Sequence, residues 1–166
     1  MDDLIEVLNE EKADYEKLVA LGEEKRQAVI SAEIDNLERI SEEEQVVAGY
    51  LQNRANKRVS IMSDMAQVLG KDPAELTVSK LIAYMENQPD EQRKLADVRE
   101  GILSVGKRLK SVNELNETLI EQAMEMVEFD LTLFRSMRQA PETANYDKNA
   151  YNTGDILGGS GFDAKQ

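Results

Sequence analysis

The pattern that most constrains the architecture lies in residues 95–137, which read LADVREGILSVGKRLKSVNELNETLIEQAMEMVEFDLTLFRSM. Steps of alternately three and four residues from Leu95 select a row, here called the seam, that is apolar except at Asn116 and Asp130. This spacing predicts one long helix whose seam packs on a neighbour, and the two polar members are expected to fix the register or to meet water. The seam comprises Leu95, Val98, Ile102, Val105, Leu109, Val112, Asn116, Leu119, Ala123, Met126, Asp130, Leu133 and Met137.

A second apolar row begins only in the latter part of this helix, about 100° around the helix from the seam. The equivalent positions nearer the start of the helix are mostly polar, as at Arg99, Lys110 and Glu117. The helix is therefore predicted to have one partner surface before about residue 119 and two after it. This second row consists of Ile120, Met124, Val127, Leu131 and Phe134.

Two further long helices are predicted before this one. Apolar residues at helical spacing run from residue 4 to about 31 and again from residue 37 to 68, where Gly70 ends the second run. Asp35 is the expected N-cap of the second helix, with Glu38 as its partner three residues on. Because the break between the helices is short, they are expected to form an antiparallel hairpin, and one continuous helix is the competing interpretation.

Thr77 is expected to cap a short third helix over about 78–87, which Pro89 ends. Asp90 and Glu91 then open the long helix, where acidic side chains complement the exposed amides of a helix N-terminus. The predicted fold class is all-α: an antiparallel helical hairpin, a short helix and a very long C-terminal helix, which form an elongated bundle or coiled coil. Residues 1–140 are expected to make this helical domain.

Helix lengths predict an apolar segment without a partner. At 1.5 Å per residue, a helix over 90–138 extends ~73 Å, whereas each hairpin arm extends only ~42 to 52 Å. The long helix is therefore predicted to pass the hairpin bend near residue 122. The third helix, a second copy of the chain or a bent hairpin could cover the segment beyond this point. The functional interpretation is a helix face that binds a client protein.

Composition excludes several classes of function. The chain has 20 Lys and Arg against 33 Asp and Glu, a formal charge of −13, and it contains neither His nor Cys. Cys/His zinc sites, disulfides and His-dependent nucleophiles are thereby excluded, and no metal, cofactor or catalytic residue is predicted. The acidic surface disfavours nucleic acid and anionic lipid heads. Because there is no long apolar run and no recognisable secretory signal, we expect no membrane insertion and a cytoplasmic location.

One motif resembles a nucleotide-binding loop. Gly101–Lys107 satisfies G-x-x-x-x-G-K, but Arg108 follows where the loop needs Ser or Thr, and the stretch falls inside the long helix. An enzyme that binds Mg-nucleotide here is therefore not expected, and the glycines are expected to permit a bend or a close neighbour. The basic residues of the second helix, Arg54, Lys57 and Arg58, are expected to form salt bridges with the acidic helices.

The C-terminal residues 141–166 lack helical periodicity and are rich in Asn, Gly, Asp and Ser. Such a tail is expected to be disordered and flexible in isolation. Because it contains Tyr146, Tyr151 and Phe162, the tail is interpreted as a peptide that becomes ordered on a partner, with Tyr146 as the favoured anchor.

The order of these parts resembles the FlgN family of bacterial flagellar export chaperones. The resemblance is carried by the layout of the helices, by Asp35-x-Leu37-x-x-Ile40-Ser41-x-Glu43-Glu44-Gln45 at the predicted bend, and by Tyr146-Asp147-Lys148 in the tail. It implies a chaperone that keeps hook-associated junction proteins unassembled and delivers them to the flagellar type III export gate. The family is thought to bind an amphipathic helical end of the client.

Carried over to this chain, the resemblance makes the second row the client-binding face: Ile120, Met124, Val127, Leu131 and Phe134. It also makes Tyr146 a contact with the export gate protein, with Tyr151 as the alternative because Ala150 stands where Gly is more usual. The competing hypothesis is a structural coiled-coil homodimer, or scaffold protein, in which the overhanging seam pairs with a second copy.

Overall fold

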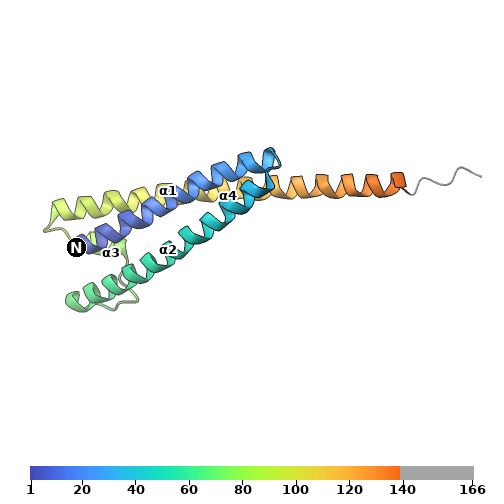
Figure 1. Ribbon diagram of the computed structural model, residues 1–166. Helices are drawn as coiled ribbons and strands as arrows, with labels where there is room; N and C mark the ends of the chain where they lie inside the picture. Colours follow the sequence, from blue (N-terminus) through green and yellow to red (C-terminus); the bar gives the residue numbers. More distant parts are fainter. Residues whose placement is uncertain (139–166) are drawn as a thin grey trace, which may run out of the picture. The chain divides into compact units, whose positions relative to one another are not determined.

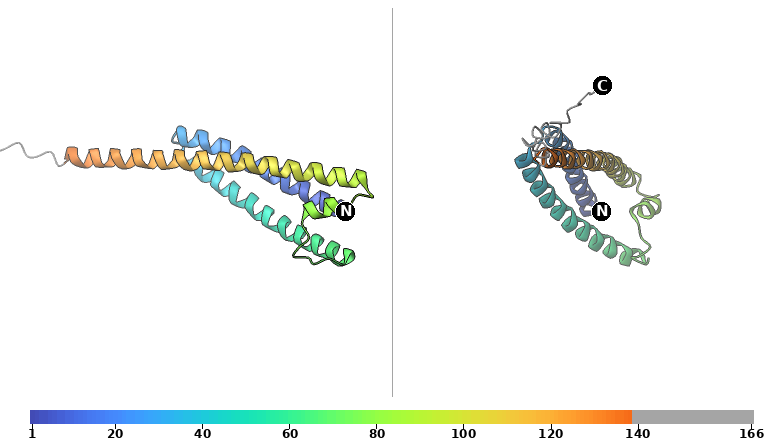
Figure 2. Two further views of the ribbon diagram at one scale, coloured as in Figure 1. Left: turned by 180° about the vertical axis from the view of Figure 1, so that it is seen from behind. Right: turned by 90° about the vertical axis from the view of Figure 1, so that its right-hand side faces the viewer.

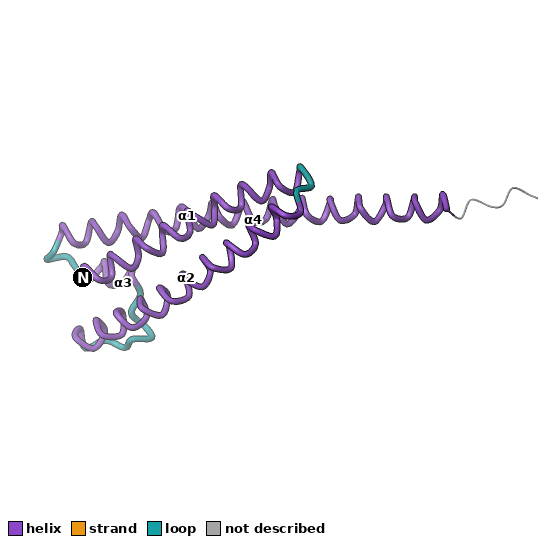
Figure 3. The backbone as a smooth tube through the Cα atoms, viewed as in Figure 1, coloured by secondary structure: helices purple, strands orange, loops and turns teal. Residues whose placement is uncertain are grey.

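The computed structural model describes residues 1–138, and every regular element in this part of the chain is a helix (Figures 1 and 3). The elements are α1 (Asp2–Ile30), α2 (Ile34–Leu69), α3 (Val78–Tyr84) and α4 (Pro89–Arg138). The predicted all-α class with a very long last helix is confirmed. Over the same residues, no helix combines the length and the apolar character that crossing a bilayer requires.

The chain divides into two compact units, Met1–Glu125 and Met126–Gln166. The first unit contains α1, α2, α3 and the greater part of α4. The second unit begins inside α4, and its described residues are the last turns of that helix, from Met126 to Arg138.

α1 and α2 form the predicted hairpin, so the continuous helix is excluded. Only Ser31–Glu33 connect them, because Ala32 adopts a left-handed conformation with φ of 54°. The N–H of Glu33 then donates to the carbonyl of Ala28 at 2.9 Å, which ends α1 with a Schellman-type turn. The predicted cap is wrong: Glu33 is the N-cap, and Asp35 lies inside the first turn of α2 because the connection is this tight.

Buried side chains hold the hairpin together along its length. Near the bend, Leu21 and Ala28 of α1 pack against Ile40 and Val47 of α2. Further from the bend, two acidic residues of α1 are buried, and arginines of α2 pair with them, as expected from their basic character. The Nε of Arg58 donates to Glu11 at 2.9 Å, and Arg54 pairs with both Glu10 and Asp14.

The α3 segment closes the end of the first unit that lies away from the bend. Thr77 caps α3 as predicted, since its side chain accepts a hydrogen bond from the N–H of Lys80 at 3.2 Å. α3 ends at Tyr84, earlier than expected, and Pro89 is the first residue of α4, a position that its fixed φ favours. The core at this end comprises Leu4, Leu8, Met62, Ala66, Leu76, Leu81, Met85 and Leu95.

The first part of α4 runs parallel to α1 and packs on it through the seam (Figure 2). Val19 of α1 clusters with Val105 and Val112 of α4. The Nδ2 of Asn116, which is only 4% exposed, donates to the carbonyl of Gly22 at 2.7 Å. Between Leu95 and Asn116 every seam residue is at least half-buried, and Asn116 fixes the register of α4 on α1.

Gly22 allows α1 and α4 to approach closely. A Cβ atom at this position would lie 2.6 Å from Cγ1 of Val112, a β-branched side chain with little rotamer freedom. By contrast, a Cβ atom at Gly49 in the middle of α2 would meet nothing within 4 Å. The sequence contains both glycines inside predicted helices, and only the structure distinguishes them.

We expect Gly22→Ala to lower the free energy of unfolding by about 1–2 kcal/mol, because overpacking outweighs the better helix propensity of Ala. The matched variant Gly49→Ala should raise it by about 0.5–1 kcal/mol. Urea denaturation followed by circular dichroism measures both. Equal stabilisation by the two substitutions would contradict the close approach of α1 to α4, and Val112→Ala should relieve the defect of Gly22→Ala.

Candidate functional site

The structure leaves the second row of α4 exposed. The exposed fraction rises from 37% at Ile120 to 60% at Met124, and it is 58% at Val127, 49% at Leu131 and 66% at Phe134. All five residues belong to one uninterrupted helix, so their spacing places them on one face. The residues predicted to bind a client are therefore accessible to one.

The seam becomes more exposed after Asn116. Leu119 and Ala123 are half-buried, and the later seam residues Met126, Leu133 and Met137 are exposed. Within residues 1–138, this exposure agrees with the predicted apolar segment that has no partner beyond the hairpin bend. α3 packs with Leu95 at the start of α4.

Helix lengths explain why the seam becomes exposed. Asn116 lies beside Gly22, and α1 continues for only eight residues more, since 30 − 22 = 8. In a parallel pair, α4 therefore has α1 beside it until about residue 124, since 116 + 8 = 124. The predicted value of about 122 is close to this. α4 is 50 residues long, compared with 29 for α1 and 36 for α2.

Within the second unit, every described residue from Met126 to Arg138 is exposed. Its large apolar side chains occupy roughly 200° of the helix circumference at 100° per residue. Phe129, which is 67% exposed, belongs to neither predicted row. Phe129 lies three residues after Met126 and four before Leu133. This spacing alone could have predicted that Phe129 lies beside the seam. The exposed apolar residues are Met126, Val127, Phe129, Leu131, Leu133, Phe134 and Met137.

Carboxylates occupy the other side of α4. They recur at intervals of three and four residues, and no Lys or Arg lies between Lys110 and Arg135. Lys110 pairs with Glu114 at 3.6 Å, whereas the other four have no ion-pair partner among residues 1–138. This acidic row beside the apolar residues is formed by Glu114, Glu117, Glu121, Glu125 and Glu128.

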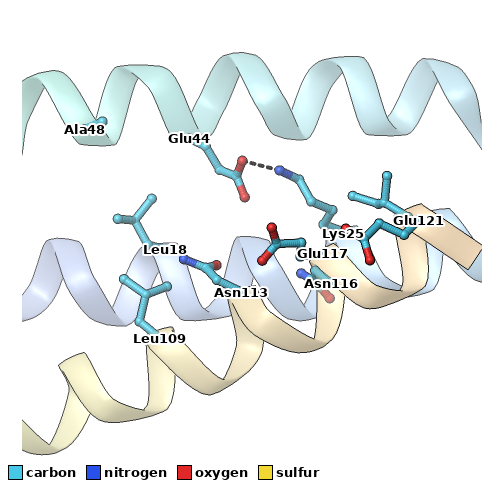
Figure 4. Close-up of a pocket in the computed structure, with 10 residues that line it drawn as sticks. Leu18, Lys25, Glu44, Ala48, Leu109, Asn113, Asn116, Glu117 and Glu121 are labelled. Atoms are coloured by element: carbon cyan, nitrogen blue, oxygen red, sulfur yellow. Dashed lines mark hydrogen bonds and ion pairs between the residues drawn. The ribbon is translucent and has the colours of Figure 1, made fainter.

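A groove of about 520 Å³ lies between α1, α2 and α4 in the first unit (Figure 4). Its apolar walls are Leu18 from α1, Ala48 from α2, and Leu109 and Ile120 from α4. Ile120 thus belongs both to this groove and to the second row. The sequence pattern did not predict the groove, because it depends on how α2 and α4 are spaced around α1.

Half of the polar residues that line the groove are acidic. Lys25 reaches from α1 to Glu44 on α2, as Figure 4 shows, and these two residues form an ion pair. Asn116 lies on the α4 side, and its Oδ1 is buried without a hydrogen-bond partner in the described structure. The polar lining residues are Lys25, Glu44, Asn113, Asn116, Glu117 and Glu121.

The residues that suggested nucleotide chemistry are helical. Gly101–Lys107 lies inside α4, where its amides belong to a helix and do not form a phosphate loop. A Cβ atom at Gly101 would lie 3.1 Å from Cε of Lys12, so this glycine has the close neighbour that was expected, whereas Gly106 has open space. Over residues 1–138, no cluster of three acidic residues is arranged to hold a metal ion.

The proposed gate contacts Tyr146 and Tyr151 lie outside the described residues, as does Phe162. The expectation of a flexible tail over 141–166 also falls there.

Comparison with protein families gives one match. The family model described as FlgN protein matches residues 1–154. No curated protein and no solved structure matches the chain. The matched range includes all four helices and both tyrosines, Tyr146 and Tyr151.

Proposed function

The chain belongs to the FlgN family of flagellar export chaperones, and from this premise we propose that it binds hook-associated junction proteins and delivers them to the flagellar type III export gate. The client-binding surface is the exposed apolar part of α4, with Ile120, Met124, Val127, Leu131 and Phe134 at its centre. This family is a family of chaperones, not of enzymes. The proposal accordingly assigns these residues to binding and none to catalysis.

The observation that carries the proposal is the concentration of exposed apolar side chains on α4. Soluble monomers rarely expose contiguous apolar patches of this kind unless the patch binds something. An amphipathic helix of the client can lie along this face, in the way that helices dock on other apolar surfaces. The Met residues of the patch, Met124, Met126 and Met137, have flexible side chains that can adapt to two related clients.

The energetics suit reversible binding. Burial of about 600 Å² of apolar surface contributes on the order of 15 kcal/mol at ~25 cal/mol per Å². Loss of translational freedom and ordering of side chains offset most of this gain, so the net affinity is far smaller. A chaperone that releases its client at the export gate needs such a moderate affinity.

Titration with a labelled peptide that represents the terminal helix of a junction protein tests the proposal. We expect saturable binding with one peptide per chain, measured by fluorescence anisotropy. The homodimer hypothesis pairs the overhanging seam with a second copy, and it predicts a tight dimer that does not open for the peptide. Sedimentation of the free chain at micromolar and nanomolar concentrations, followed by the titration, separates the two.

Tyr146→Ala should reduce secretion of the junction protein about tenfold or more and leave client binding unchanged, because truncation of an aromatic anchor typically costs ~2 kcal/mol. The measurement is the amount of junction protein in the culture medium, with peptide affinity measured in parallel. Tyr151→Ala is the matched variant and shows which tyrosine contacts the gate. If deletion of 141–166 leaves export unchanged, the tail has no docking role.

A further inference from the structure

The groove between α1, α2 and α4 has a lining that lacks available cationic donors. Its one cation, Lys25, is already paired with Glu44. The Nδ2 of Asn116 is used by the carbonyl of Gly22. Apart from the exposed amide of Asn113, the polar groups that remain are the carboxylates of Glu117 and Glu121 and the Oδ1 of Asn116. Since these groups can only accept hydrogen bonds, an occupant must supply the donors.

Asn116 provides the observation that points to a ligand. The residue is 4% exposed, and its Oδ1 is buried without a partner, although its Nδ2 makes a good hydrogen bond. A buried acceptor without a donor is unfavourable, so a donor that enters the groove gains more there than at an exposed acceptor. Register alone requires only the bond to Gly22, and the second polar atom of the amide is left without a hydrogen bond.

Charge and shape define the occupant further. Glu117 and Glu121 are one helical turn apart, and neither has an ion-pair partner within the described chain. The groove therefore favours a cation. Its walls, which include Leu18, Leu109 and Ile120, are apolar and suit the aliphatic stem of a long basic side chain.

We infer that this groove receives an arginine side chain from the client helix. Arginine fits better than lysine, because its planar guanidinium offers five donors that can reach two carboxylates and an amide oxygen together. Ile120 lines the groove and also opens the second row, so one client helix on α4 can reach both. The inference rests on the proposed function. It adds that the client helix carries an arginine next to its apolar residues.

The test combines chaperone variants with the terminal-helix peptide of a junction protein. Glu117→Gln/Glu121→Gln should weaken peptide binding about tenfold, the usual scale for a charge-assisted hydrogen bond at a partly exposed site. Glu6→Gln/Glu86→Gln makes the same change in net charge at exposed positions that do not line the groove, and it should bind like the wild type. Unchanged melting temperatures establish that all variants are folded.

The chaperone variants are combined in a double-mutant cycle with a peptide in which one arginine is replaced by citrulline, its neutral isostere. The replacement should weaken binding to the wild type about tenfold and should have little further effect on Glu117→Gln/Glu121→Gln, because the two changes remove one interaction. The side-chain amide resonance of Asn116 should shift on binding of the arginine peptide and not of the citrulline peptide.

Each contrary outcome has a distinct meaning. If the groove variant and the citrulline peptides bind like their parents, while Val127→Asp/Phe134→Asp abolishes binding, the groove inference is wrong and the proposed function stands. If the peptide does not bind the wild type at all, both are wrong. If the Asn116 resonance of the free full chain changes in Lys148→Gln/Lys165→Gln, the cation comes from the chain's own tail and the client assignment is overturned.

Discussion

Val127→Asp/Phe134→Asp is expected to abolish client binding, with a loss in affinity of about a thousandfold, and to leave the helix content unchanged. Two central apolar contacts in an interface cost ~2 kcal/mol each when removed, and about 4 kcal/mol corresponds to this factor. The variant should retain the fold because both side chains are more than half exposed and belong to none of the buried clusters. Peptide titration and circular dichroism measure the two quantities.

A matched variant separates the apolar surface from the added charge. Thr132→Asp/Ser136→Asp introduces the same two carboxylates in the same turns of α4, but at exposed polar positions away from the second row. It should retain most of the affinity. If Val127→Asp/Phe134→Asp instead unfolds the domain, these residues belong to a core and the proposed binding face is wrong.

Arg58→Met is expected to lower the free energy of unfolding by about 3 kcal/mol, the largest stability effect of the substitutions considered. Glu11, the partner of Arg58, has a side chain that is only 6% exposed. Removal of the arginine leaves a buried carboxylate without its countercharge, which is more costly than loss of an exposed ion pair. Urea denaturation at neutral pH gives the difference.

Arg39 provides the control for this prediction. It belongs to the same helix and pairs with Glu43 and Glu24, but all three side chains are well exposed. The hydrogen bond with Glu43 and then the charge of Glu24 raise the pKa of Arg39 above its usual value, although arginine is already fully protonated near neutral pH. The free energy of unfolding of Arg39→Met should therefore be close to that of the wild type. Equal losses in Arg39→Met and Arg58→Met would show that burial of Glu11 has no special effect.

Much of the fold follows from apolar spacing alone. The hairpin, the capped α3 and the long α4 were all predicted, because a three- and four-residue repeat specifies a helix and the face that it buries. The cap at Asp35 was misplaced, since nothing in the composition of Ser31–Glu33 indicates that Ala32 adopts a left-handed conformation. Helix boundaries depend on local backbone conformations that differ little in energy.

The site was predicted less completely. The exposure of the second row, and of the seam beyond the hairpin bend, followed from helix lengths. The burial of Glu11 and the close approach at Gly22 depend on contacts between helices that a single sequence does not reveal. The groove around Asn116 depends on the same contacts.

The acidic row of α4 has a consequence for the concentration at which the protein stays dispersed. The carboxylates on the other side of α4 add to the long-range repulsion between copies of a chain with a net charge of −13, and this repulsion opposes the approach of their apolar sides. The acidic residues of the same helix thus help to keep the protein dispersed despite its exposed apolar residues. Addition of salt or acidification toward the isoelectric point of about 4.5 weakens that protection and promotes precipitation.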